Sequence, residues 1–296
     1  MEQRKGIWLA VAAYFVWGVG PIFWNTLSTV PALQVLGHRI VWSVPILFAI
    51  IAGRGRLSSL RSAFRTPGTA RTALAGGVLL AFNWGVFVWA VTSDHIVDAS
   101  LGYFINPLVS VALGVIVLRE HLSTAQRIAV AIAAVGVAGM TIVAGVVPWI
   151  SLALAFSFAA YGLLKKRSNA APPFEGLFME TAFVAAPALL YLAVVAGEGD
   201  GAFGSSPTIT LLLIAAGAYT VTPLVLFAAA ARQIPLSLLG ILQYIAPTMH
   251  LIIGVVVFDE VISGGEWFGF FMVWVALIVY TVDNARTIRR AESAMS

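Results

Sequence analysis

Two stretches decide how this chain folds: "YFINPLVSVALGVIVLRE" (residues 103–120) and "YIAPTMHLIIGVVVFDE" (residues 244–260). Each is an apolar run of helical length with a proline near its start and a glutamate at its end. At an offset of 140 residues seven positions of the window 100–123 are identical, among them Pro107 with Pro247, Gly114 with Gly254, and Glu120 with Glu260. This match between distant segments indicates an internal repeat. We expect the two glutamates to cap helices or fix loops.

The composition places most of this chain in lipid. Of its 296 residues 60% are hydrophobic and only 10% are charged, and the mean hydropathy is +0.95. A soluble domain is about 45–50% apolar and about 25% charged, so charges this sparse would not cover a water-exposed surface. The absence of cysteine excludes disulfides, cysteine nucleophiles and thiolate metal sites. The four histidines show no metal-ligand spacing, so we expect neither a metal nor a cofactor.

Ten apolar segments have the length of a membrane-spanning helix, which needs roughly 20 residues. The predicted spans are 6–25, 32–52, 71–91, 97–118, 125–145, 148–165, 174–196, 207–230, 237–258 and 266–284. The connections are short except near 53–71. The sequence therefore predicts an all-α polytopic membrane protein without a separate soluble domain.

The lysines and arginines predict the orientation. With ten spans, 16 of the 17 basic residues gather on the side that carries both termini, and the opposite loops hold only acidic charges. Cytoplasmic loops carry the excess of basic residues, so both termini are expected in the cytoplasm and the spans in the plasma (inner) membrane. The net charge of +4 is then a topology signal, and nucleic acid is not an expected partner.

The repeat divides the chain into two halves of five spans. We expect a first repeat over 1–146, a second over 147–284 and a cytoplasmic tail over 285–296. A further pair, Pro45 and Pro187, supports the division. An odd number of spans inverts the second half relative to the first. Inverted repeats are typical of transporters with a substrate site near the bilayer midplane.

Pro107 and Pro247 are predicted to bend helices at equivalent places in the two halves. A proline frees a backbone carbonyl, which a membrane helix tolerates where neighbouring groups or cavity water satisfy it. Asn106 and Gln243 lie beside the two bends, and buried amides need partners. We interpret these positions as the lining of a cavity. The alternative is a static kink that improves packing.

Several blocks of the sequence together resemble one family. They include "AAYFVWGVGPIFW", "HRIVWS", "NWGVFVWAV", "YGLLKK" and "LFAAAARQIPLSLLGILQYIAPT", and the resemblance covers about 6–283. The chain is similar to the RarD subfamily of the EamA-type drug/metabolite transporter superfamily. The resemblance implies a ten-helix inner-membrane permease built from two EamA repeats. His250 departs from that pattern, which weakens any substrate inference made through it.

Ionisable residues within membrane helices are functional-site candidates. Arg39 suits the anionic group of a substrate, because a guanidinium binds carboxylates in a bidentate manner; it could instead extend to headgroups or bond freed carbonyls. Its neighbour His38 is a further substrate-binding candidate. Glu180 and His250 are candidates for proton coupling, with a helix-packing acid and a satisfied core histidine as the alternatives.

The other expected substrate-binding residues are polar or aromatic side chains inside apolar spans. They are Asn83, Trp84, Tyr103, Asn106, Gln243 and Tyr244, with Trp17 and Tyr161 as further lining candidates. Tryptophan and tyrosine also populate membrane interfaces, so each has a structural alternative.

The expected function is secondary transport of small metabolites or drug-like amphiphiles by alternating access. We expect an exporter, with proton coupling as a candidate energy source. An uptake permease or facilitator for amino acids or other carboxylated metabolites is the main alternative, and a membrane enzyme is a weaker one. No GxxxxGK[ST] motif occurs, so no ATPase subunit is expected. A homodimer remains open.

Overall fold

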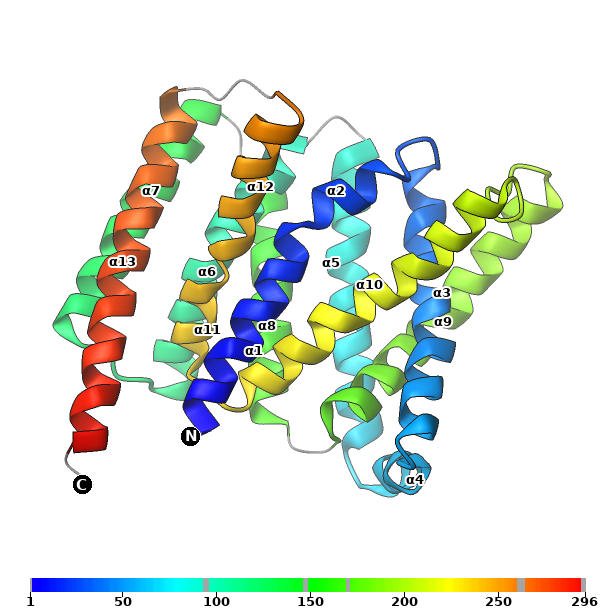
Figure 1. Cartoon of the computed structure of the whole chain (residues 1–296), viewed down its shortest axis with the longest axis horizontal. Coiled ribbons are helices and arrows are strands. Elements are labelled where there is room, and N and C mark those ends of the chain that lie inside the picture. The colour runs from blue at the N-terminus through cyan, green and yellow to red at the C-terminus, as the bar shows by residue number, and fades with distance from the viewer. Residues whose placement is uncertain (1, 93–95, 146–148, 169–170, 260–263, 294–296) are drawn as a thin grey trace.

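The computed structural model describes residues 2–92, 96–145, 149–168, 171–259 and 264–293. The described chain folds into thirteen helices (Figure 1). They are α1 (Glu2–Gly18), α2 (Gly20–Asn25), α3 (Ala32–Gly53), α4 (Leu57–Arg65), α5 (Thr69–Thr92), α6 (Ile96–Leu118), α7 (Thr124–Ala144), α8 (Trp149–Arg167), α9 (Pro173–Gly197), α10 (Pro207–Ala231), α11 (Leu236–Leu242), α12 (Ile245–Val257) and α13 (Gly264–Ser293).

Every predicted span is occupied by one helix or by two consecutive helices. The first span contains α1 and α2, and the ninth contains α11 and α12. The long connection contains the short helix α4, which buries Leu60 and Ala63. Eight helical segments of the described chain are long and apolar enough to cross a membrane. The protein is therefore an all-α, multi-pass membrane protein.

Both termini lie at the same end of the helix bundle (Figure 1). We call this the inner end, because the basic residues predict that it faces the cytoplasm, and we call the opposite end the outer end. The α2–α3 connection lies at the outer end, and α4 lies at the inner end. Helix α13 continues past the predicted tail boundary as far as Ser293, so the described part of the expected tail is helical.

Equivalent helices of the two halves of the sequence make equivalent contacts. α3 of the first half packs against α10, and its counterpart α9 packs against α5. At both contacts a glycine allows close approach. A Cβ on Gly77 would lie 2.7 Å from the Glu180 carbonyl oxygen, and one on Gly217 would lie 2.7 Å from Trp42 Cβ. The two glycines are 140 residues apart, the same offset as the opening repeat.

The two repeat-related prolines lie in different local structures. α6 is one helix that continues through Pro107, whereas the ninth span breaks between α11 and α12, just before Pro247. α6 and α11 approach closely, because a Cβ on Gly240 would lie 2.8 Å from the Pro107 carbonyl oxygen. The described structure thus has one interrupted helix where the sequence predicted a matched pair, and a bend at Pro107 remains a prediction.

Candidate functional site

A cavity of about 580 Å³ lies between the two halves and extends to the outer end. Leu27 and Ser28 of the α2–α3 connection line it at that end. Helices α1, α2, α3, α5, α6, α8, α10 and α12 supply the other walls. Its size is that of a small-molecule site, for which about 300–1,000 Å³ is usual.

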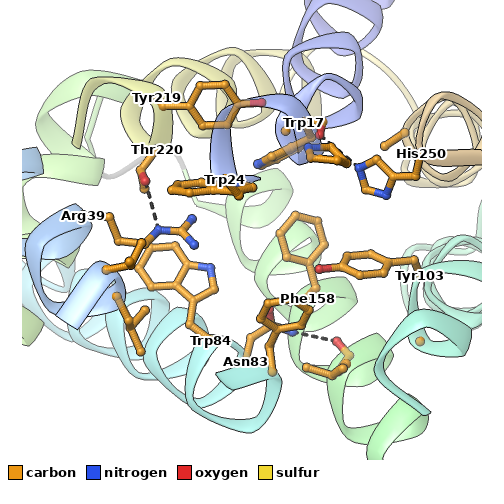
Figure 2. Close-up of a pocket in the computed structure, with 18 of the residues that line it drawn as sticks. Trp17, Trp24, Arg39, Asn83, Trp84, Tyr103, Phe158, Tyr219, Thr220 and His250 are labelled. Carbon is orange, nitrogen blue, oxygen red and sulfur yellow. Dashed lines mark hydrogen bonds between the residues drawn. The ribbon is translucent and has the colours of Figure 1, made fainter. Parts of the chain in front are cut away.

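Arg39 forms one wall of the cavity. Its guanidinium carbon lies 5.0 Å from the ring centroid of Trp24 and 4.7 Å from that of Trp84. Its Nε donates to Thr220 Oγ1 at 3.0 Å, and the Thr220 hydroxyl donates onward to the Ala216 carbonyl at 2.8 Å. These contacts fix the plane of the guanidinium between two indole rings (Figure 2).

The positive charge of Arg39 has no acidic partner among the described residues. Figure 2 shows the two terminal nitrogens directed into the cavity, away from Thr220. A guanidinium within a membrane protein is costly to bury without a counter-charge. The geometry of this wall therefore suits an anionic group supplied from the cavity.

His250 lies on the opposite wall (Figure 2). Its Nε2 is 3.1 Å from the Trp17 carbonyl oxygen. A carbonyl only accepts hydrogen bonds, so Nε2 carries a proton and the neutral ring keeps Nδ1 as an acceptor. The Tyr103 ring packs edge-on against the imidazole, with centroids 6.0 Å apart.

Asn83 lies between these two walls (Figure 2). Its Nδ2 donates to the Leu154 carbonyl and to Ser157 Oγ, both at 2.9 Å. Those two bonds use the donors of the amide and fix its orientation. Within the described parts of the chain the acceptor oxygen of Asn83 has no partner, so it can bind a ligand or water.

The cavity brings together most of the residues that the sequence singled out. Its lining includes Trp17, Arg39, Asn83, Trp84, Tyr103, Asn106, Gln243, Pro247 and His250. Their individual roles in substrate binding and proton coupling remain predictions.

Five candidates lie outside the cavity lining: His38, Pro107, Tyr161, Glu180 and Tyr244. His38 stacks on Phe203 with ring centroids 5.2 Å apart. Tyr244 is fully buried and donates to the Phe104 carbonyl at 3.2 Å.

Glu180 is paired within the helix bundle. It is only 2% exposed, and it accepts hydrogen bonds from Lys165 Nζ and, at 3.1 Å, from the Tyr161 hydroxyl. Lys165 is itself 3% exposed. Sequence reasoning counted Lys165 among the basic residues flanking a span, and its burial was missed.

The lining residues that sequence reasoning missed include Trp24, Phe158 and Tyr219. The sequence "GVGPIFW" before Trp24 contained a signal, because two glycines and a proline favour a helix break. That break separates α1 from α2, and α2 carries Trp24.

Polar contacts hold chain segments together at the inner end of the bundle. Glu120 accepts hydrogen bonds from the backbone amides of Leu236 and Ser237 at 2.7 and 2.9 Å, and from Ser237 Oγ at 2.7 Å. Lys166 Nζ donates to the Ile234 carbonyl at 2.6 Å. The expectation that Glu120 fixes a chain connection is thus confirmed; Glu260 lies outside the described residues.

The comparisons with known proteins agree with this architecture. The model of the EamA-like transporter family matches residues 4–142 and again 147–282. Protein RarD of Streptomyces exfoliatus is 44% identical over 99% of this chain and 93% of its own. The uncharacterized transporter YojE of Bacillus subtilis is 40% identical over 99% of this chain and 98% of its own.

A solved crystal structure with 20% identity covers 94% of this chain and 97% of its own, with a TM-score of 0.72. At that identity the likeness bears on the fold alone. The two family matches and the near full-length relatives bear on the family. This membrane transporter belongs to the EamA-like transporter family and, within it, to the RarD proteins.

Proposed function

We propose that this transporter carries small amphiphilic solutes with an anionic group, and that Arg39 binds that group. The observation behind the proposal is the guanidinium held between Trp24 and Trp84 with no acidic partner among the described residues. The indole rings offer apolar area to the rest of the solute. A carboxylated metabolite with an aromatic or aliphatic body matches both properties.

We further propose that transport proceeds by alternating access. The cavity reaches the outer end, while Glu120 and Lys166 help to close the inner end. This arrangement supports an outward-open conformation. An inverted repeat allows the complementary inward-open conformation, because each half can adopt the arrangement of the other.

The orientation and direction of transport are parts of the same proposal. The basic residues favour the inner membrane with both termini in the cytoplasm. We keep export as the expected direction, with uptake or facilitated diffusion as the alternative. Proton coupling through Glu180 or His250 also remains a proposal. It predicts that solute addition to liposomes containing a trapped pH dye moves protons, and that Glu180→Gln or an equivalent change at His250 abolishes the movement.

The substrate class is tested with three ligands that share one ring and differ in charge: phenylacetate, phenylacetamide and phenethylamine. Binding is measured by calorimetry on the detergent-purified protein. We expect the carboxylate to bind at least about 10-fold more tightly than the amide, because hydrogen bonds to a charged group contribute about 1.5–3 kcal/mol. Arg39→Gln should remove that preference.

Arg127→Gln is the matched control. It removes a basic side chain that is exposed, that is hydrogen-bonded to Thr124 and that does not line the cavity. Equal affinities for the three ligands in the unmodified protein would overturn the proposed substrate class. A carboxylate preference that survives Arg39→Gln would overturn the role of Arg39.

A further inference from the structure

A second group of charged residues lies toward the inner end, outside the large cavity. Lys165, Glu180 and Arg232 line a small void of about 20 Å³. Glu180 bonds Lys165, and Arg232 donates from Nη2 to the Ala171 carbonyl. The Nε of Arg232 is buried and has no hydrogen-bond partner. The void is of about the size that holds one water molecule.

One face of α8 connects the cavity with this group. Leu154 and Phe158 line the cavity, and Tyr161 and Lys165 follow at the next helical positions on the same face. At 1.5 Å per residue, Lys165 lies roughly 10 Å beyond Phe158 along the helix axis. Figure 1 shows that α8 runs to the inner end, so its last residues, including Lys165, lie farther inward than the cavity-lining Phe158.

An aromatic layer separates the two sites. The Phe227 ring packs on Trp17 and Phe158 of the cavity wall, with centroids 5.9 and 5.2 Å apart. The same ring stacks on Tyr161 at 5.9 Å. The hydroxyl of Tyr161 in turn donates to Glu180. One layer of rings therefore has the cavity on one side and the Lys165–Glu180 pair on the other.

The lining of the small void holds more basic than acidic side chains. Two basic side chains and one carboxylate line it, together with the hydroxyl-bearing residues Thr69, Thr72 and Ser168. Glu180 pairs with Lys165. Arg232 donates to the Ala171 carbonyl and interacts electrostatically with Glu180 and with the buried Glu175. Its Nε still has no hydrogen-bond partner among the described residues and can donate to an anionic group.

We propose that Lys165 and Arg232 form a second subsite for the anionic group of the substrate, reached from the inner end, and that Glu180 occupies it while the cavity is open outward. This inference rests on the proposed function, because Arg39 supplies the anionic substrate class. Separation of α5 from α9 would expose Lys165, and the incoming carboxylate would replace Glu180 as its partner. Glu180 thus holds the inner subsite closed in the absence of substrate.

The test is exchange of phenylacetate across proteoliposomes, with equal concentration and equal pH on both sides and label on one. Such exchange needs no net proton movement, so a coupling role of Glu180 does not affect it. We expect Lys165→Gln to lower the exchange rate about 10-fold or more, the usual size for a lost charged contact. Binding of phenylacetate at the Arg39 cavity should stay within about 2-fold of its original affinity.

Substitution of Glu180, alone and together with Lys165, distinguishes a substrate subsite from an ion pair that only stabilises the fold. If the subsite exists, Glu180→Gln raises the exchange rate, because no carboxylate of the protein then competes with the substrate for Lys165. The double variant Lys165→Gln/Glu180→Gln is as slow as Lys165→Gln. If the pair only stabilises the fold, both single variants are impaired and the double variant recovers, because neither charge is left unpaired. That recovery, or unchanged exchange in Lys165→Gln, would overturn the proposal.

Two control variants are needed to interpret the exchange rates. Lys165→Arg retains the charge and should retain exchange, and Arg127→Gln removes an exposed charge at the same end of the bundle. If Lys165→Gln fails to fold, the exchange rate of the Lys165→Gln/Glu180→Gln variant tests the proposal, because this variant removes both charges together. Failure of phenylacetate to bind the unmodified protein would overturn the proposed function and this inference with it; normal binding with normal exchange in the double variant overturns the second subsite alone.

Discussion

Glu120 offers the sharpest test of the proposed closure of the inner end. Its carboxylate accepts three hydrogen bonds at the start of α11, at 2.7–2.9 Å. Glu120→Gln removes the negative charge and turns one acceptor oxygen into a donor that faces other donors. The loss of one charge-assisted bond at this half-buried position is worth about 1.5 kcal/mol. The equilibrium between outward-open and inward-open conformations should therefore shift inward roughly 10-fold.

Single cysteines report this shift, since the chain has none of its own. Ser28→Cys places a thiol at the outer end of the cavity, and Thr72→Cys places one beside the inner void. With Glu120→Gln, maleimide labelling should slow at position 28 and accelerate at position 72. Glu198→Gln, an exposed acid following α9, is the control. Unchanged labelling at both positions would refute the role given to Glu120.

Two further substitutions test individual contacts. Trp24→Ala removes one of the two rings beside Arg39 and should weaken phenylacetate binding several-fold, because a desolvated cation–π contact is worth about 1–2 kcal/mol; calorimetry that shows unchanged affinity would contradict this. Tyr244→Phe removes the hydrogen bond that the buried Tyr244 hydroxyl donates to the Phe104 carbonyl and should cost about 1 kcal/mol of stability. A thermal melt in detergent, with Tyr191→Phe at a less buried tyrosine as control, measures that loss, and equal melting temperatures would show that the bond contributes nothing.

The helices were predictable because hydropathy is a local property. About 20 apolar residues need no tertiary information to be recognised as a span. The distribution of basic residues then predicted that both termini share an end. The interruption after Leu242 was less accessible, because Pro107 and Pro247 give the same local signal while α6 continues through its proline and the ninth span breaks before it.

The candidate site was predictable where a polar side chain interrupts an apolar run, as for Arg39 and Asn83. The site was not predictable where the burial of a side chain depends on a partner from another helix. Lys165 reads as a flanking charge in "YGLLKK", and only the carboxylate of Glu180 from α9 makes its burial tolerable. Glu180 was recognised as unusual, but its pairing toward the inner end depends on how α8 and α9 pack.

The order of helices in one layer has a consequence for the membrane potential. α10 packs on α3, α3 on α9, and α9 on α5, so the two interhelical contacts made close by Gly217 and Gly77 share the central α3–α9 pair. In the proposed alternating-access cycle, a tilt of that pair toward α5 would press one contact together while it pulls the other apart. The outer and inner ends of the cavity would then never be open together. A cell that keeps this protein in its membrane would in that case lose no ions through it between transport cycles.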